Sequence, residues 1–472
     1  MTRSFDLAIL GAGPGGYSAA IRARQLGLSV ALIDPGLAGG VCLHEGCIPS
    51  KALLHAAKLR RMAMHEGALM GLGFAQPTVD VAALQNWKRG IVERLESGVS
   101  GLLKKHGVER FPHRGRLTHA SGLELLNDKG EACDRLGFRN LILATGSREK
   151  RLAALGESPA LWYPRDALAF GKVPERLAII GAGIIGLELG QLFCRLGSEV
   201  HLYDALPELL PRRDRRLVAS LKKSLEGEGM RFHLGARIDA LEGQTLAFEE
   251  GGAKRREVFE RVLSCVGRRP NSEGLGLERI NIATDASGHV DVNVWLQTPL
   301  HHIFAIGDLV AGPQLAHRAS RMGLLAAENA TGRRYPWDVR GLPSVLYTDP
   351  ELAWVGIGKA EAREKGLEVK IGAFPLAANG RAQTENATLG SMELVCDRVD
   401  GRVLGAEALG SQAEGLVSSV SLAMEMAGTA EDIAAAVWPH PSLFEALGES
   451  AEAVDHRAIH LFQESAARRP EA

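Results

Sequence analysis

The stretch Gly11-Ala12-Gly13-Pro14-Gly15-Gly16 decides how the first part of this chain folds. It follows an apolar run at residues 5–10, typical of a buried strand, and precedes a helical pattern over residues 17–26. Gly11 permits a tight turn, Gly13 lets the backbone approach a pyrophosphate, and Gly16 lets helix and strand pack closely. The stretch therefore predicts a βαβ unit that binds dinucleotide phosphates at the N-terminus of its helix.

An acidic residue completes this pattern, and the whole arrangement occurs twice. The strand pattern after the first helix ends at Asp34, where a carboxylate can accept hydrogen bonds from a ribose. A second strand pattern precedes Gly181-Ala182-Gly183-Ile184-Ile185-Gly186, and the strand after that helix ends at Asp204. Both acidic residues follow the first glycine by 23 positions (34 − 11 and 204 − 181). We therefore expect two dinucleotide sites, with Gly181, Gly183 and Gly186 serving the second.

The second site is expected to prefer NAD over NADP. Ala205 follows Asp204, so no arginine stands at the strand end to receive a 2′-phosphate. Arg212 and Arg213 come later and are expected to be solvated.

Two cysteines, Cys42 and Cys47, lie between the first Gly-rich loop and a helical pattern. Positions i and i+5 of a regular helix are about 7.5 Å apart along its axis, too far for a disulfide. A bridge needs an irregular turn, for which Gly46 supplies backbone freedom. Two buried, reduced cysteines are the alternative. The position beside a dinucleotide loop favours a redox-active disulfide.

A histidine and a carboxylate near the C-terminus supply a candidate base. His440 lies between two prolines, and Glu445 falls in the first turn of the next expected helix. A structural hydrogen bond is the alternative role for such a pair. A dithiol centre needs a base to form the thiolate nucleophile, and this need favours a catalytic role.

Several further strand ends carry candidate cofactor contacts. Ala144, Thr145 and Gly146 follow one buried strand, Gly267 follows another, and Asp308 ends a third. Asp308 can bind a sugar or ribityl hydroxyl, or can serve only as a turn residue or helix cap. Residues 104–115 carry no motif and are expected on the surface.

Composition excludes several classes of function. The 472 residues carry a net charge of −1 and 24% charged residues, so no electrostatic case exists for nucleic acid or an anionic membrane. No apolar run reaches membrane-spanning length, and the first residues leave no room for a targeting peptide. Six cysteines in so long a chain do not form a secreted disulfide framework. We expect a cytoplasmic protein.

These motifs resemble those of the flavoprotein disulfide reductases, nearest to the members that oxidise dihydrolipoyl groups, the dihydrolipoamide dehydrogenases. The likeness covers almost the whole chain, in the order Gly11–Gly16, Gly40–Lys51, Ala144–Gly146, Gly181–Glu188, Gly267–Asn271, Ala305–Asp308, Leu315–His317, Tyr347–Glu351, Ala378–Ala382 and His440–Glu445.

The resemblance implies an α/β fold with two Rossmann-like dinucleotide-binding domains and a C-terminal α+β dimerisation domain. It assigns residues 1–149 to FAD binding, 150–274 to NAD binding, 275–344 to a central domain that completes the FAD site, and 345–472 to the interface. It also implies a homodimer in which the His–Glu pair of one subunit faces the disulfide of the other. The implied partner is a lipoylated carrier protein or the core of a 2-oxo acid dehydrogenase complex.

The resemblance also assigns roles to single residues. Cys42 is the thiol that meets the substrate, Cys47 the thiol against the flavin, and His440 with Glu445 the base. Lys51 and Glu188 form an ion pair near flavin N5, and Asp308 binds the ribityl chain. The implied FAD contacts are Gly11, Gly13, Gly16, Asp34, Gly40, Lys51, Ala144, Thr145, Gly146, Asp308 and Ala316. The implied NAD contacts are Gly181, Gly183, Gly186, Glu188, Asp204 and Gly267.

Four residues depart from the family pattern. His44 and Glu45 stand between the cysteines, where an ionisable pair is expected to tune the thiols. Trp438 is expected to make the mouth of the site bulkier, and Met322 replaces a common acidic residue. From these departures we hypothesise an unusual lipoylated carrier.

Other reductases and a binding role are the alternatives. Nothing after Cys396 is a cysteine, which opposes mercuric reductase and the large thioredoxin reductases. Asp204 opposes glutathione reductase, and the complete cysteine pair opposes the soluble transhydrogenases. A docking subunit without activity would lack bound flavin. The remaining cysteines are Cys133, Cys194, Cys265 and Cys396. They show no ligand spacing, so they are expected to be packing residues, and no metal site is expected.

Overall fold

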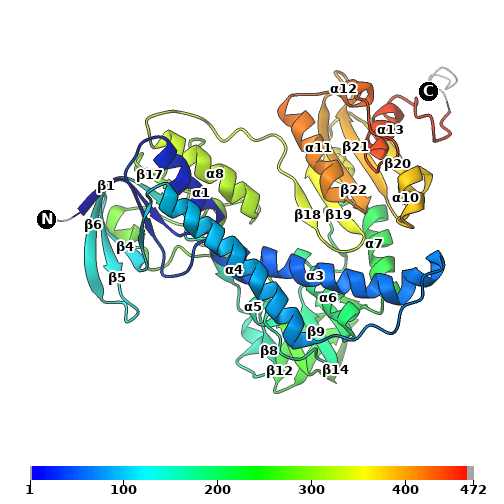
Figure 1. Cartoon of the computed structure of the whole chain (residues 1–472), viewed down its shortest axis with the longest axis horizontal. Coiled ribbons are helices and arrows are strands. Elements are labelled where there is room, and N and C mark those ends of the chain that lie inside the picture. The colour runs from blue at the N-terminus through cyan, green and yellow to red at the C-terminus, as the bar shows by residue number, and fades with distance from the viewer. Residues whose placement is uncertain (1–2, 465–472) are drawn as a thin grey trace.

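The first sheet is organised around a central parallel strand that leads into the first Gly-rich loop. The computed structural model describes residues 3–464 and shows this sheet at the N-terminal end of the molecule (Figure 1). Its strand order is β3-β2-β1-β6-β5-β4, and β17 also pairs with β6. The strands are β1 (Arg3–Leu10), β2 (Val30–Ile33), β3 (Glu109–Phe111), β4 (Arg114–His119), β5 (Gly122–Leu126), β6 (Ala132–Leu143) and β17 (Ile303–Ala305).

Two helices from distant parts of the sequence pack together in this unit. α1 (Pro14–Gln25) follows the Gly-rich loop, and α8 (Ala316–Asn329) lies against it (Figure 1). A side chain at Gly323 would overlap the Gly15 carbonyl oxygen, so a glycine is needed where the two helices cross. Residues near 305–329 therefore complete a unit that begins at the N-terminus.

The expectation that residues 104–115 lie on the surface is confirmed for most of them and is wrong for Val108 and Phe111, which are buried. β3 extends the sheet beside β2, Phe111 is buried, and the Asp34 N–H donates to the Phe111 carbonyl oxygen over 3.1 Å. The helix before it, α4 (Val81–Lys105), was not predicted, and only Leu103 of its 25 residues is buried. Its apolar residues nevertheless recur every three or four positions, for example at Leu84, Ile91 and Leu95, which is the pattern of one helix face.

The second sheet repeats the first arrangement. Its order is β11-β10-β9-β15-β8, and all its pairings are parallel. The strands are β8 (Leu161–Trp162), β9 (Arg176–Ile180), β10 (Glu199–Asp204), β11 (Arg231–Leu234) and β15 (Arg261–Ser264), with α5 (Pro164–Leu168), α6 (Ile184–Leu196) and α7 (Arg215–Gly227) as helices. An antiparallel meander of β12 (Arg237–Glu242), β13 (Thr245–Glu250) and β14 (Ala253–Val258) accompanies it.

The chain passes between the two units at a short antiparallel ribbon. β7 (Ser147–Glu149) pairs with β16 (Arg268–Pro270), and Thr145 and Asn271 exchange hydrogen bonds of 2.8 and 3.0 Å beside it. The third unit is an antiparallel sheet with helices. Its elements are β18 (Ser344–Leu346), β19 (Glu351–Gly356), β20 (Val369–Pro375), β21 (Ser391–Asp397), β22 (Val403–Gly410), α9 (Lys359–Glu364), α10 (Gly380–Thr384), α11 (Ala413–Glu425), α12 (Ala430–Ala435) and α13 (Glu445–Ala453).

This architecture confirms the predicted α/β fold with two Rossmann-like units. The domain limits at 149, 274 and 344 remain our proposed division of the chain. Among residues 3–464, no helix is both long enough and apolar enough to cross a membrane.

The expectation that Arg213 is solvated is also wrong. Its guanidinium lies 2.9 Å from Glu407 and 4.9 Å from the Trp354 ring centroid, and its side chain is only 11% exposed. The Asp214 N–H donates to the other Glu407 oxygen over 2.7 Å. Arg213 therefore joins the second unit to the third sheet, because a buried carboxylate such as Glu407 needs a charged partner.

A buried histidine makes the second unit sensitive to acid. His201 on β10 lies 3.0 Å from Glu199 and 3.1 Å from His233, and Tyr203 stacks on His233 at 4.4 Å. Burial lowers the pKa of His201, although the hydrogen bond to Glu199 acts in the opposite direction. Between that lowered pKa and the ordinary value of about 6.5, the unfolded chain binds a proton that the folded chain does not.

We therefore predict that acidification below about pH 6.5 lowers the free energy of unfolding through His201. The loss continues until the pH passes the lowered pKa, and it amounts to about 1.4 kcal/mol for each unit of difference between the two pKa values. Chemical denaturation at pH 7.5 and 5.5 measures it. His201→Gln should flatten this pH dependence, whereas His65→Gln at an exposed position should not. Equal pH dependence in all three proteins would contradict the prediction.

Candidate active site

The two cysteines form a disulfide at a break between two helices. α2 (Gly40–Glu45) ends at Gly46, and α3 (Cys47–Arg61) starts directly after it. Gly46 adopts φ −140° and ψ −108°, which turns the chain and brings the Cα atoms of Cys42 and Cys47 to 4.8 Å. The predicted disulfide and irregular turn are confirmed. Cys42 is half-buried, and Cys47 is exposed.

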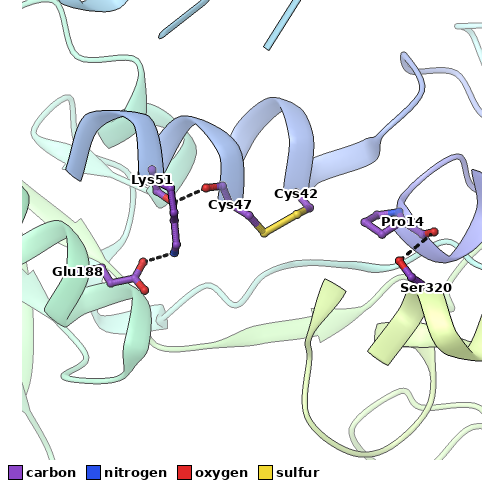
Figure 2. Close-up of a disulfide and its surroundings, with 7 residues drawn as sticks. Pro14, Cys42, Cys47, Lys51, Glu188 and Ser320 are labelled. Carbon is purple, nitrogen blue, oxygen red and sulfur yellow. Dashed lines mark hydrogen bonds and ion pairs between the residues drawn. A yellow bond between two sulfur atoms is a disulfide. The ribbon is translucent and has the colours of Figure 1, made fainter. Parts of the chain in front are cut away.

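An ion pair lies beside the disulfide and connects the two dinucleotide units. Lys51, one turn after Cys47 on α3, places its Nζ 2.6 Å from Glu188 Oε2 on α6. Figure 2 shows Lys51 pointing to the same side of α3 as the disulfide, toward Glu188 on the neighbouring helix. The Glu188 side chain is 5% exposed and that of Lys51 is 35% exposed. The carboxylate is thus buried with its charge compensated, and the ammonium keeps access to the space beside the disulfide.

The glycines of the first Gly-rich loop occupy distinct environments. A Cβ on Gly11, whose φ is +105°, would overlap the Ala144 carbonyl oxygen, and one on Gly16 would overlap the Gly11 carbonyl oxygen. A Cβ on Gly13 meets no heavy atom within 4 Å. Gly40 passes directly over Gly13, because its own Cβ would stand 2.7 Å from the Gly13 Cα. Two glycines are therefore required by packing, while the middle one faces open space.

The second loop repeats this division. A Cβ on Gly181 would meet the Cys265 carbonyl oxygen, one on Gly186 would overlap the Gly181 carbonyl oxygen, and one on Gly183 has open space. Gly267, with φ +104°, follows β15 near this loop. Neither α1 nor α6 has a side-chain N-cap or an acidic residue in its first turn. Both helix N-termini can therefore receive phosphate oxygens.

Asp34 and Asp204 have the same contacts at the ends of β2 and β10. One oxygen of Asp34 accepts the Ala12 N–H over 2.6 Å, and one oxygen of Asp204 accepts the Ala182 N–H over 2.7 Å. The other oxygen accepts an N–H two residues further on, over 2.7 and 2.8 Å. Each carboxylate thus fixes its Gly-rich loop, and a carboxylate oxygen has a second lone pair for a ribose hydroxyl.

Asp308 belongs to a hydrogen-bonded chain that the sequence did not reveal. The Ser147 hydroxyl donates to Asp308 Oδ2 over 2.6 Å and accepts from Arg268 Nε over 2.7 Å. Buried Arg318 donates to the Gly307, Ala311 and Pro313 carbonyl oxygens and holds the loop between Asp308 and α8. Ser147 and Arg268 come from the ribbon β7–β16, so only the pairing of distant strands identifies them.

The remaining predicted contacts lie at the same edge of the first sheet. Gly146 adopts φ +68°, and its carbonyl oxygen accepts the Asn271 N–H over 2.9 Å. Ala316 is the first residue of α8. Ala144 lies against Gly11, and Thr145 is hydrogen-bonded to Asn271.

His440 and Glu445 lie together in the third unit. His440 Nδ1 is 2.9 Å from Glu445 Oε1, and the Ser442 N–H donates to Glu445 Oε2 over 2.9 Å. Partial burial acts to raise the pKa of Glu445, but these hydrogen bonds outweigh it and hold the pKa below its usual value. The imidazole is 79% exposed. Figure 1 shows α13, which starts at Glu445, far from α3, so within one chain this pair does not meet the disulfide.

His44 and Glu45, the two residues between the cysteines that depart from the family pattern, each have a partner of their own. His44 Nε2 is 2.9 Å from the Ala38 carbonyl oxygen, and Glu45 lies 3.7 Å from Arg165. These contacts fix both side chains outside the ion pair beside the disulfide.

Trp438 makes its contacts within the third unit. It stacks on Phe444 at 6.5 Å, donates to the Ile433 carbonyl oxygen over 3.2 Å and fits against Gly448. Met322 is buried in the core of the first unit. The residues that motivated an unusual carrier thus serve packing and local hydrogen bonding.

The four remaining cysteines differ in environment. Cys396 is fully buried, and Cys194 and Cys265 are half-buried, which agrees with packing roles. Cys133 is exposed, so the expectation of a packing role is wrong for it. Its position on the outer part of β6, where the strand extends beyond the core, explains the exposure.

The residues at both loops fit dinucleotide cofactors. The open space above Gly13 and Gly183 is matched by uncapped helix N-termini, and an orienting aspartate stands at each adjoining strand end. FAD at the first loop would be held by that loop, by Asp34, and by Asp308 at the edge of the first sheet. It would supply two-electron chemistry beside the disulfide. NAD at the second loop would be held by Gly181–Gly186 and Asp204 and would supply the hydride acceptor.

Comparison with known proteins supports this arrangement over the whole chain. The pyridine nucleotide-disulphide oxidoreductase family matches residues 5–323, and its dimerisation domain matches residues 342–451. The dihydrolipoyl dehydrogenase of Thermus scotoductus is 41% identical over 97% of this chain and 99% of its own length. The dihydrolipoyl dehydrogenase of Geobacillus stearothermophilus is 39% identical over 96% and 97% of the two chains.

Solved structures support the fold. LpdA from Mycobacterium tuberculosis superimposes with a TM-score of 0.87, covers 96% of this chain and 99% of its own, and is 24% identical. The flavoprotein disulfide reductase RclA from Escherichia coli has a TM-score of 0.83, covers 94% and 98% of the two chains, and is 23% identical. With its two dinucleotide loops, its disulfide and its dimerisation domain, the chain belongs to the pyridine nucleotide-disulphide oxidoreductases and is an FAD- and NAD-dependent, homodimeric flavoprotein of that family.

Proposed function

We propose that this protein is a dihydrolipoyl dehydrogenase, which oxidises dihydrolipoyl groups to lipoyl groups and reduces NAD⁺ to NADH. The observation that carries the proposal is the Cys42–Cys47 disulfide at the start of α3, with the Lys51–Glu188 pair joining the two dinucleotide units beside it. Two dihydrolipoyl dehydrogenases near 40% identity over almost the full chain support the choice of substrate.

The disulfide accepts the electrons of the substrate dithiol by thiol–disulfide exchange. A dihydrolipoyl thiolate attacks the Cys42 sulfur, forms a mixed disulfide and releases Cys47 as a thiolate. The second substrate thiol then attacks its own mixed-disulfide sulfur, which releases the cyclic lipoyl disulfide and leaves two reduced cysteines. Two electrons have moved to the protein. One thiol proton passes to a base, and the other goes to the Cys42 sulfur as that sulfur leaves the mixed disulfide, so Cys42 ends as a thiol and Cys47 as a thiolate.

His440 of the partner subunit is the proposed acceptor of a substrate proton. The Glu445 carboxylate orients the imidazole through Nδ1 and leaves Nε2 to face the thiol. Because His440 lies outside the disulfide region of its own chain, the dimer of the family supplies the missing base. The low pKa of Glu445 keeps the carboxylate ionised throughout the neutral range.

The proposed physiological partner is a lipoylated carrier protein or the core of a 2-oxo acid dehydrogenase complex. The hypothesis of an unusual carrier stays a prediction, and equal turnover of free and variously carried dihydrolipoyl groups would contradict it. We place the protein in the cytoplasm. Its four other cysteines are unpaired, which agrees with a reducing compartment.

The reaction itself provides the first test. We expect NADH formation from dihydrolipoamide and NAD⁺, measured by absorbance. Cys42→Ser should lower its rate by at least about 10³-fold, because the substitution removes the sulfur that the substrate thiolate attacks. Cys133→Ser, which replaces an exposed cysteine without a disulfide, should leave the rate unchanged. A flavin-containing protein that turns over other disulfides but not dihydrolipoamide would contradict the proposed substrate.

The base can be tested separately. His440→Gln is expected to lower kcat by about 10²–10⁴-fold, the range for loss of a general base. Glu445→Gln should cost less, because the imidazole stays while its orientation is weakened. Mixing His440→Gln and Cys42→Ser chains in one dimer should restore activity at one of the two sites if the base comes from the partner. Absence of any recovery in isolated heterodimers would contradict the shared site.

Asp204 is expected to determine the affinity for NAD⁺. Asp204→Ala removes the acceptor that fixes the Ala182 N–H and the proposed ribose contact, so we predict a rise in KM for NAD⁺ of about 10-fold or more. Steady-state kinetics with NAD⁺ and NADP⁺ measure the effect. Asp239→Ala, on the surface of β12, is the matched control. Unchanged KM in the Asp204 variant would contradict a nucleotide contact there.

A further inference from the structure

We propose that Tyr347 is a positioning residue for the Lys51–Glu188 pair and that its aromatic ring fixes the Lys51 ammonium beside the disulfide and the flavin. The inference rests on the FAD-binding character of the family and not on the dihydrolipoyl substrate. Tyr347 follows β18 in the third unit, so it reaches this pair from a part of the chain about 300 residues away.

Glu188 is held from two sides. Its Oε2 receives the Lys51 ammonium over 2.6 Å, and its Oε1 accepts the Tyr347 backbone N–H over 2.9 Å. Both oxygens of the buried carboxylate are therefore engaged, and its plane is defined by two donors on different units. A carboxylate fixed in this way offers Lys51 a single place to bind.

The ring of Tyr347 provides the second contact of the ammonium. Lys51 Nζ lies 4.6 Å from the ring centroid, within the range of a cation–π interaction. Burial raises the pKa of the Tyr347 hydroxyl, and the carboxylates of Glu414, Glu351 and Glu188 act in the same direction. The ring therefore stays neutral, and Lys51 is held between a carboxylate and an aromatic face.

The position of the ring is itself fixed by the residues that follow it. Gln191 on α6 exchanges two hydrogen bonds of 2.8 Å with the backbone of Asp349. The Asp349 carboxylate lies 3.1 Å from Arg195 and 3.2 Å from Lys58. The segment after Tyr347 is thus clamped to α6 and α3, the same helices that carry Glu188 and Lys51.

This clamp matters for the chemistry because of where Lys51 lies. Residues four apart on a helix share a face, so Lys51 and Cys47 point to the same side of α3 (Figure 2). A fixed positive charge there favours the thiolate of reduced Cys47 and the electron-rich form of an adjacent cofactor. A Lys51 side chain without the ring would keep its charge but sample more positions in water.

A purely structural role for Tyr347 makes different predictions. If the residue only anchors its segment, its loss lowers stability and leaves the redox properties unchanged. If it acts through Lys51, the redox properties change and the effect disappears when Lys51 is absent. Tyr347→Phe keeps the ring face, whereas Tyr347→Leu keeps much of the apolar volume but removes the ring.

The test uses the flavin-containing protein and needs no dihydrolipoyl substrate. Dithionite titration against an indicator dye gives the flavin midpoint potential, and two-electron reduction gives the long-wavelength absorbance of a thiolate beside the oxidised flavin. We expect Tyr347→Leu to weaken the flavin's equilibrium preference for the reduced form by about 2- to 30-fold, the range of a cation–π contact, and to diminish that absorbance. Tyr347→Phe should retain both. Tyr335→Leu, which removes a ring 5.9 Å from Arg333, is the matched control and should also retain both.

A double-mutant cycle decides between the two roles. In a Lys51→Met background, Tyr347→Leu should change neither the potential nor the absorbance further, because the ring has no ammonium to hold. Additive effects of the two substitutions would overturn the proposal. So would a fall in thermal midpoint for Tyr347→Leu with an unchanged potential. These outcomes are independent of turnover with dihydrolipoamide, so failure of the proposed substrate leaves them intact.

Discussion

The contact between α3 and α6 is the constraint on which the arrangement of this protein depends. α3 begins at a redox-active cysteine, and α6 begins at the second Gly-rich loop, so their contact sets where the two cofactor regions meet. At that contact Glu188 is almost inaccessible to water, and a charge so buried is tolerated only with a partner. Lys51 satisfies this requirement from the helix that carries the disulfide. Removal of either partner would leave a charge in a place where neither unit could compensate it alone.

The same contact explains why residues from the third unit reach the centre of the molecule. The segment after β18 donates a backbone N–H to Glu188 and places a carboxylate beside Arg195 and Lys58. Its backbone also exchanges two hydrogen bonds with the Gln191 side chain. Glu188, Gln191 and Arg195 recur at helical spacing and form one face of α6. A dimerisation unit that docks on this face also orients the two dinucleotide units. Arg213 with Glu407 adds a second connection between the dimerisation unit and the second dinucleotide unit. The placement of the dimerisation unit and the geometry of the site are therefore coupled through the same helices.

The sequence predicted those parts of the protein in which local backbone geometry dictates the residue type. Gly11 and Gly16 are fixed by overlap with backbone oxygens, and Gly181 and Gly186 repeat them, so spacing alone located both loops. Ser147, Arg268 and Tyr347 were missed as site residues because they become neighbours of Asp308 and Lys51 only through strand pairing and docking between units. The solvated role expected for Arg213 failed for the same reason, because Glu407 and Trp354 reach it from the third unit. In each case tertiary contacts, which leave no local pattern, decided the outcome.

The departures from the family pattern show how such tertiary contacts change the meaning of a residue. His44 and Glu45 looked like modifiers of the thiols because they stand between the cysteines in sequence. In the structure the helix break at Gly46 separates their side chains from the ion pair, and each finds a partner of its own in Ala38 or Arg165. Lys51, four residues beyond Cys47, is by contrast on the disulfide's side of α3. Tuning of the disulfide is therefore expected from the pair held between α3, α6 and Tyr347, and not from the residues that the sequence places nearest to the sulfur atoms.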